Sequence, residues 1–221
     1  AYGEYMNALF RGDALPAEER TAVARKLARL TGLAPEYVER TNLRIEHMRF
    51  CKELLRDQRR TVGRLDSRFT GADRDAAGET MSYDPSSAAT SGPYAGALNS
   101  YVREELNYTS DLPYEILAHL YESWDYGKHQ NKFVDMSETL RSAMTQNPFL
   151  KVIIANGYFD LATPFSATEY TVDHLALEPE LRGNVQMTYY EAGHMMYVHG
   201  PSLAKLAGDL RGYLQGVVAG E

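Results

Sequence analysis

The chain has 221 residues, of which 44% are hydrophobic and 24% are charged, so it can bury a core and is not disordered as a whole. The 23 Lys and Arg residues against 30 Asp and Glu residues give a net charge of −7, which argues against a nucleic-acid partner. No apolar run approaches the roughly 20 residues that a membrane-spanning helix needs, so we expect no membrane partner and one domain, alone or with a cap.

The first 60 residues are predicted to form a helical cap. The expected helices cover 2–10, 16–30, 35–40 and 46–59. Pro16 suits the first turn of the second helix, and Gly32 suits its end. Cys51 lies on the apolar face of the fourth helix, which predicts a packed, unreactive thiol. Because it is the only cysteine, no internal disulfide can form.

The middle of the chain is less regular in its pattern. Residues 61–69 are predicted to be extended, 70–92 to form a long loop, and 93–106 to form a helix, whereas 114–121 fit a strand or a helix equally well. Tyrosines recur here at positions 83, 94, 101, 108, 114, 121 and 126. We expect a half-buried interface between the cap and a sheet, with a peptide-binding groove as the alternative.

The last third predicts a strand–helix–strand unit. Leu150–Ala155 and Val185–Tyr190 are of strand length and rich in β-branched or aromatic residues, and a helix-like segment from Pro164 to Leu177 separates them. Such a unit places the two strands parallel in one sheet. Helices are expected on either side of it, at 135–147 and 201–218.

Each of these strands leads into a loop with a titratable residue. Asp160 follows the first strand, and His194 follows the second. Ligands of open α/β sheets bind beyond the carboxyl ends of the strands, and an acid followed by a histidine is the order of an acyl-transfer triad in α/β-hydrolases. The acid would orient the imidazole, and the imidazole would take a proton from a nucleophile. The alternative is that Asp160 caps a helix and His194 is a structural loop residue.

Neighbouring residues support this interpretation or compete with it. Gly157 and Gly193 permit the tight backbone of the two loops, and Asn156 and Thr163 are expected to hold the Asp160 loop by short hydrogen bonds. Glu191 is a second candidate acid, but it lies only three residues before His194. His199 is predicted to support the site from behind or to cap the last helix, and His174 to have a surface or packing role. The spacing of Glu191, His194 and His199 does not fit a zinc site.

Two segments carry a resemblance to a known family. NGYFDLATPF (156–165) and YYEAGHMMYVH (189–199) resemble the C-terminal part of bacterial serine carboxypeptidases, which are peptidases of the α/β-hydrolase fold. The segments ALFRGDALP (8–16), VGRLDSRFTG (62–71) and SYDPS (82–86) are similar to that family as well. The resemblance implies an α/β fold, helix-rich, in which the helical cap of residues 1–60 precedes the last strands of a mostly parallel sheet. Residues 61–221 would form the C-terminal part of the catalytic domain.

The resemblance also implies roles for individual residues. Asp160 matches the catalytic acid and His194 the base, while Met195 would help to wall the substrate pocket, with core packing as its alternative role. The nucleophilic serine, the oxyanion hole and the groups that grip the substrate carboxylate lie upstream in the family. This sequence contains no Gly-x-Ser-x-Gly, and Ser91 lacks the first glycine of that motif.

The sequence therefore predicts a serine carboxypeptidase-like hydrolase, represented by a C-terminal fragment that is inactive alone. A peptide substrate is implied, the missing N-terminal half of the same protein is the implied partner, and neither a cofactor nor a metal is implied. The alternatives are a non-catalytic partner-binding module and an esterase or acyl hydrolase of the same fold. Two strands without neighbours expose unpaired edges, so we expect the chain to form homo-oligomers, aggregate or bind its other half.

Overall fold

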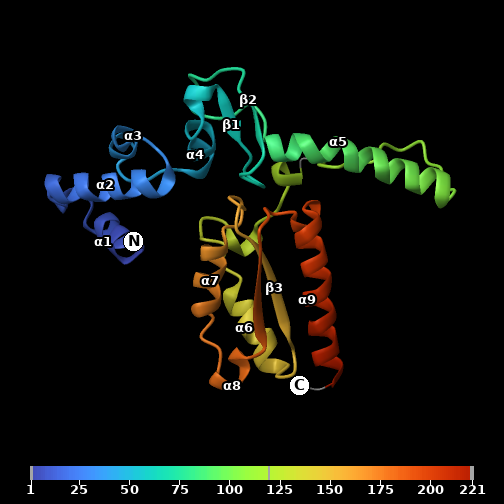
Figure 1. Ribbon diagram of the computed structural model, residues 1–221. Helices are drawn as coiled ribbons and strands as arrows, with labels where there is room; N and C mark the ends of the chain where they lie inside the picture. The colour runs from blue at the N-terminus through green and yellow to red at the C-terminus, as the bar shows by residue number, and fades with distance from the viewer. Residues whose placement is uncertain (1, 119, 220–221) are drawn as a thin grey trace. The chain divides into compact units, whose positions relative to one another are not determined.

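The computed structural model describes residues 2–118 and 120–219 (Figure 1). The chain divides into two compact units, the first ending at Ser86 and the second beginning at Ser87. Helices predominate, and the described strands form two small sheets, one antiparallel and one parallel, in keeping with a helix-rich α/β protein. The division of roles between a cap (1–60) and a catalytic domain (61–221) stays a prediction. None of the helices in the described ranges is long and apolar enough to cross a bilayer.

The first unit begins with the helices that the sequence predicts. They are α1 (Tyr2–Arg11), α2 (Ala17–Thr31), α3 (Pro35–Arg40) and α4 (His47–Glu53). Gly32 ends α2 in the left-handed region at φ 79°, and its N–H donates to the Ala28 carbonyl at 2.9 Å. The fourth helix is shorter than predicted, because a 3₁₀ turn, Arg56–Gln58, replaces its last turn. The helices share a core of Ala8, Leu15, Val23, Ala24, Ala28, Leu33, Val38 and Leu43.

A small antiparallel hairpin follows α4. β1 (Arg60–Val62) pairs with β2 (Thr70–Ala72), so the prediction of a loop over 70–92 is wrong at its start. It is also wrong at its end, where α5 begins at Pro85. The first error arises at Gly71, because glycine favours loops by its intrinsic propensity. Here it lies within a strand, where the absence of a side chain lets another residue approach the backbone closely. A methyl group at Gly71 would overlap the hydroxyl of Tyr83.

A buried ion pair lies between α4 and the segment that follows β2. The side chains of Lys52 and Asp73 are only 1% and 2% exposed, and the Lys52 ammonium contacts the Asp73 carboxylate. The same ammonium donates to the backbone carbonyl of Asp75. Two charges held out of water in this way are stable only as a pair.

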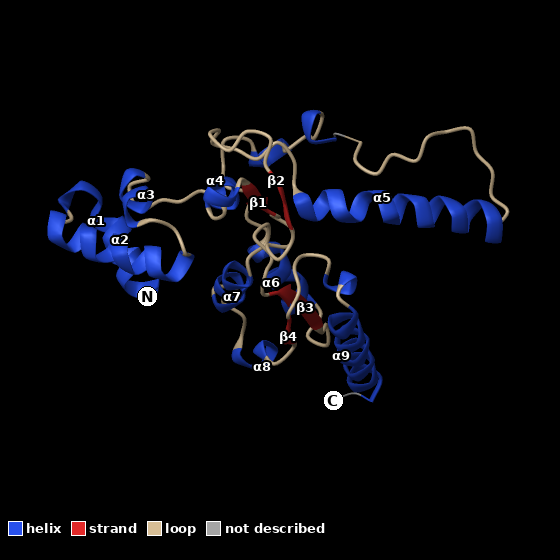
Figure 2. Ribbon diagram, turned by 45° about the horizontal axis from the view of Figure 1, so that its top comes forward, coloured by secondary structure: helices blue, strands red, loops and turns tan. Residues whose placement is uncertain are grey.

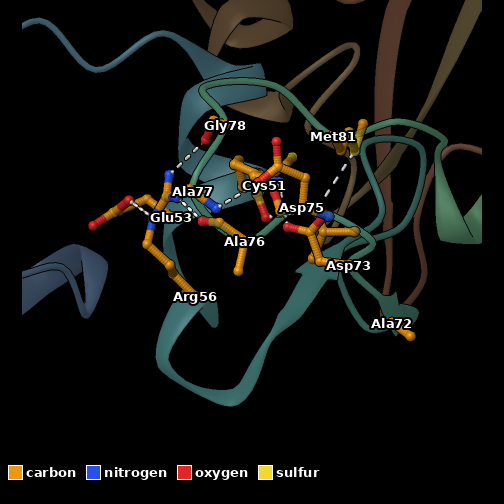
Figure 3. A network of polar contacts seen from close by, with 12 residues as sticks. Cys51, Glu53, Arg56, Ala72, Asp73, Asp75, Ala76, Ala77, Gly78 and Met81 are labelled. Carbon is orange, nitrogen blue, oxygen red and sulfur yellow. Dashed lines mark hydrogen bonds and ion pairs between the residues drawn. The ribbon is translucent and has the colours of Figure 1, made fainter.

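The same loop is anchored a second time by Arg56. Its guanidinium donates to the carbonyl oxygens of Ala76 and Gly78, as Figure 3 shows. Nearby, Cys51 is fully buried, and burial raises the pKa of its thiol to about 11. The predicted packing of this thiol is thus confirmed, and its raised pKa is in keeping with the predicted low reactivity.

Replacing Lys52 by methionine should remove one partner of the buried pair and leave the Asp73 carboxylate uncompensated. We expect the free energy of unfolding to fall by about 3–5 kcal/mol, measured by urea titration followed by far-UV circular dichroism. Arg49→Met is the matched control, because Arg49 pairs with Glu79 at 2.7 Å on an exposed surface. That change should cost less than about 1 kcal/mol, and equal losses in the two variants would contradict the assigned role of the buried pair.

The second unit contains the predicted strand–helix–strand. Its elements after residue 134 are α6 (Ser137–Gln146), β3 (Val152–Gly157), α7 (Phe165–Asp173), α8 (Pro179–Arg182), β4 (Val185–Tyr190) and α9 (Gly200–Ala219). β3 and β4 are parallel, in a register that runs from Val152 opposite Val185 to Gly157 opposite Tyr190. The prediction of two parallel strands is confirmed.

The pleat of this sheet assigns its helices to two faces. Val185 packs against a core cluster that contains Met144 of α6 and Leu175, which follows α7. Tyr190, an odd number of positions further along β4, points to the other face and packs with Leu206 of α9. Accordingly, α6 and α7 lie on one side of the two strands and α9 on the other (Figures 1 and 2). Because β3 and β4 are parallel, their carboxyl ends lie at the same end of the sheet.

The segment between the hairpin and α6 differs most from the prediction. α5 (Pro85–Ser100) starts earlier than expected, contains Pro93, and continues as a π-helical turn, Tyr101–Glu105. Within 114–118 and 120–121 neither a strand nor an α-helix forms, and the prediction for residue 119 lies outside the described residues. The seven tyrosines are 41–70% exposed, and their place in an interface between a cap and a sheet stays a prediction. Among them, the Tyr94 ring meets that of Tyr197 edge-on at 6.3 Å, and the Tyr83 hydroxyl donates to the Ala72 carbonyl at 3.1 Å.

Candidate active site

Asp160 lies in the loop that joins β3 to α7. One carboxylate oxygen, Oδ1, accepts the backbone N–H groups of Ala162 at 2.8 Å and Thr163 at 2.9 Å. The other oxygen, Oδ2, accepts the Thr163 hydroxyl at 2.6 Å. The side chain thus forms a turn within its own loop rather than capping α7, whose N-cap is Pro164, and Oδ2 also faces the second loop. Thr163 holds the loop as expected, through its side chain as well as its backbone.

The imidazole of His194 meets this carboxylate. Its Nδ1 lies 2.8 Å from Asp160 Oδ2, across 34 positions of sequence. Because an ionised carboxylate can only accept hydrogen bonds, Nδ1 carries the proton and Nε2 is the basic nitrogen. The Asp160 side chain is 4% exposed and the His194 side chain 45%, so the acid is buried beneath an accessible base.

The electrostatics keep the acid ionised. Burial alone raises the pKa of the Asp160 carboxyl, but the hydrogen bonds from Thr163, His194 and Ala162 outweigh burial and hold this pKa below its usual value. Asp160 therefore stays charged at neutral pH, which lets it orient the imidazole and stabilise its cationic form.

Close backbone packing brings the two loops together. The N–H of Tyr158 donates to the carbonyl of Tyr190, and the N–H of Phe159 to that of Ala192, both at 3.0 Å, which extends the pairing beyond the strands. At Gly157 a methyl group would overlap the carbonyl oxygen of Gly193 and lie 2.6 Å from that of Ala192. The predicted need for a small residue at Gly157 is explained by this approach rather than by a positive φ.

Asn156 joins the two strands one residue earlier. Its buried side-chain amide donates to the carbonyl of Thr188 on β4 at 3.2 Å and to that of Ile154 at the same distance. The predicted short hydrogen bonds of Asn156 therefore secure the sheet below the loop, rather than the loop itself.

An aromatic cluster beside the acid loop was not predicted. Tyr158 stacks on Tyr189 with ring centroids 5.7 Å apart, and Phe165 meets both edge-on. The Tyr189 hydroxyl donates to Glu169 of α7 at 2.7 Å, and this hydrogen bond, together with burial, raises its pKa to about 12. The sequence held one signal for this cluster. Tyr189 and Tyr190 are adjacent on β4, so their rings point to opposite faces of the sheet.

The remaining candidate residues occupy other positions. Met195 is half-buried directly after His194, and its role in a substrate pocket stays a prediction. His199 Nδ1 lies 2.8 Å from the hydroxyl of Ser202 in the first turn of α9, a contact between side chains, so its predicted role as a helix cap stays a prediction. His174 is exposed, ends α7 and stacks on Tyr170. Glu191 is exposed. In the described ranges, no group of three or more His, Cys, Asp or Glu residues could hold a metal ion.

The arrangement therefore provides an oriented base with its partner acid, at the carboxyl ends of adjacent parallel strands. Comparison with known proteins adds no assignment: no protein-family model, no curated protein and no solved structure matches this chain.

Proposed function

We propose that Asp160 and His194 are the acid and the base of a serine carboxypeptidase-like α/β-hydrolase, which releases C-terminal residues from peptides through an acyl-enzyme. The observation that carries the proposal is the 2.8 Å contact between Asp160 Oδ2 and His194 Nδ1. Its position supports the same reading, because α/β-hydrolases present the acid and then the histidine on loops after parallel strands.

In this proposal His194 Nε2 takes the proton from a serine hydroxyl, and then donates it to the leaving amine. The serine and the oxyanion hole are supplied by a polypeptide segment outside these 221 residues, since the sequence has no Gly-x-Ser-x-Gly. Ser202 is an unsuitable nucleophile: it is 3% exposed and contacts His199 rather than His194. Met195 would border the substrate. An ester or acyl substrate would use the same machinery.

A fluorophosphonate that labels activated serines tests this assignment. We expect no serine of the 221-residue chain to be labelled. A polypeptide that also includes the coding sequence upstream of Ala1 should be labelled at one serine in that upstream part, because only there can His194 meet a nucleophile. Intact-mass and peptide mass spectrometry would locate the label.

His194→Gln in the longer polypeptide is the control, and it should abolish labelling while the protein remains folded. His174→Gln, a change at an exposed histidine away from the acid, should leave labelling intact. Labelling of the 221-residue chain itself, at Ser202 or elsewhere, would contradict an external nucleophile. An upstream sequence without an activatable serine would contradict the hydrolase assignment.

A partner-binding module is the second candidate, and one observation favours it. Large apolar side chains between residues 94 and 136 are exposed to an extent that is unusual for a surface without a partner. The exposed residues are Tyr94, Leu98, Tyr101, Leu106, Tyr108, Leu112, Tyr114, Ile116, Leu117, Leu120, Tyr121, Trp124, Tyr126, Phe133, Val134 and Met136. The other half of the same protein, or a second copy, would cover them. This candidate alone predicts binding without any phosphonate-reactive serine.

A further inference from the structure

The turn that holds Asp160 is closed by its own hydrogen bonds. The carboxylate accepts the backbone N–H groups of Ala162 and Thr163, together with the Thr163 hydroxyl. These bonds fix the carboxylate within its own loop, whereas His194, the other member of the dyad, lies 34 positions further along the chain. Beyond the contacts that His194 itself makes with Asp160 and Thr163, the place of the whole loop depends on how its two ends are attached to β4.

The two ends of the acid loop are attached to β4 in different ways. At its start, backbone hydrogen bonds from Tyr158 and Phe159 extend the strand pairing. At its end, Phe165 begins α7, and its ring meets that of Tyr189 edge-on, with centroids 6.2 Å apart. The same Tyr189 ring stacks on Tyr158 at 5.7 Å. One ring of β4 therefore contacts a side chain at either end of the loop.

The hydroxyl of Tyr189 adds a second attachment to α7. It donates to Glu169 at 2.7 Å. Phe165 and Glu169 are four positions apart and lie on the same face of the helix, so both reach Tyr189. None of the residues of α7 is buried, and its position therefore depends on a small number of such contacts. The first turns of the helix are held on β4 by the ring and the hydroxyl of one side chain.

We propose that Tyr189 is a positioning residue of the dyad: it holds the start of α7 on β4, and so holds the Asp160 carboxylate against the imidazole of His194. The inference rests on the proposed function, because the distance between acid and base matters where Nε2 must take a proton. Without the Tyr189 ring, the end of the acid loop should come free while its start stays paired. The turn would then move as a unit and carry Asp160 away from His194.

The loop of His194 is supported separately, on the opposite face of the sheet. A buried cluster lies there, made of Tyr190, Ala192 and Met196. Because adjacent residues of a strand point to opposite faces, the Tyr189 ring lies on the other side of the sheet from this cluster. Its loss should therefore loosen the acid loop and leave the base loop in place.

The test measures how well the Nδ1 proton of His194 is protected in the 221-residue chain. Histidine is labelled with ¹⁵N in its ring, and the His194 signal is identified by its loss in His194→Gln. At one fixed pH above ~8, where imidazoles are neutral, exchange of this proton with water reports how often its bond to Asp160 opens. In Tyr189→Leu we expect exchange at least ~10-fold faster, the factor that corresponds to two aromatic contacts and one hydrogen bond.

Three further variants divide the contributions. Tyr189→Phe keeps the ring and loses the bond to Glu169, so it should restore part of the protection that Tyr189→Leu loses. Phe165→Leu removes the partner ring at the end of the loop and should resemble Tyr189→Leu. Tyr170→Leu is the matched control and should exchange as the wild type, because Tyr170 also lies on α7 but is 54% exposed and stacks on His174.

Amide hydrogen exchange at Ala162 and Thr163 reports whether the Asp160 turn itself survives, because both N–H groups bind Oδ1. It should stay at the wild-type rate in every variant, and an equal rise there would overturn the proposal, since the turn would then unfold rather than move. Wild-type protection of His194 in both Tyr189→Leu and Phe165→Leu would overturn it too. Phe165→Leu, which leaves Tyr189 in place, decides alone if Tyr189→Leu does not fold.

These outcomes separate the inference from the function on which it rests. None of the measurements needs turnover, and retained protection in the variants would overturn the role of Tyr189 alone. An Nδ1 proton that exchanges in the wild type as fast as in free histidine would contradict the Asp160–His194 pair itself, and with it both the proposed function and the inference.

Discussion

Replacing Asp160 by asparagine should lower kcat about 10⁴-fold in the polypeptide that supplies the serine, as loss of the triad acid does in serine proteases. The asparagine amide would present a donor to Nδ1, which favours the tautomer with its proton on Nε2 and removes the base. The Oδ1 contacts with the backbone would survive in one orientation of the amide. Turnover of a peptide substrate under saturating conditions measures the effect.

Glu191→Gln is the matched control, because Glu191 is the other acidic residue close to His194 in sequence and is exposed. It should change kcat by less than about 3-fold, in the range of a change at the surface. A near-normal rate for Asp160→Asn would remove this residue from the dyad. A large loss for Glu191→Gln would transfer the role of the acid to Glu191.

The second large effect is expected at Gly157. A methyl group there would overlap the Gly193 carbonyl oxygen, and both neighbours in contact are backbone atoms, so the loop of His194 must move. We expect Gly157→Ala to lower the free energy of unfolding by about 1–3 kcal/mol. It should also reduce kcat roughly 100-fold, because a shift of about 1 Å at the reacting groups has that effect.

Gly183→Ala provides the comparison. Gly183 precedes β4, has φ −65°, and a methyl group there would meet nothing within 4 Å. The free energy of unfolding of this variant should change by less than about 1 kcal/mol, and we expect an increase rather than a decrease. If Gly157→Ala matched Gly183→Ala in stability and rate, the close approach of the two loops would not be what positions the dyad.

The elements with strong periodicity were predictable from the sequence. β4 coincides with its predicted range, β3 is displaced by two residues, and α3 has its predicted ends. Short apolar runs bounded by Gly, Pro and Asn carry this information locally. The β1–β2 hairpin was missed because its second strand contains Gly71, whose fitness for a strand depends on the distant Tyr83. The propensities of single residues carry no information about such a contact.

The two main residues of the candidate site were predictable from the sequence, but the hydrogen bonds that link them to their neighbours were not. The order of Asp160 and His194 and their places after two strands indicated that they would meet. The contact of the Thr163 hydroxyl with both residues depends on the rotation of one side chain, which no spacing rule encodes. The Asn156 bridge to Thr188 likewise depends on strand register. Composition alone did not indicate how far each of the middle tyrosines is exposed, because it does not reveal what packs against each ring.

The central claim is that the carboxylate of Asp160 and the imidazole of His194 form one hydrogen-bonded pair. A crystal structure of the 221-residue chain at neutral pH measures it most directly. We predict a separation of Oδ2 and Nδ1 close to 2.8 Å, with Thr163 Oγ1 bound to the same carboxylate oxygen. Two well-ordered side chains pointing into separate surroundings, beyond about 4 Å from each other, would contradict the account.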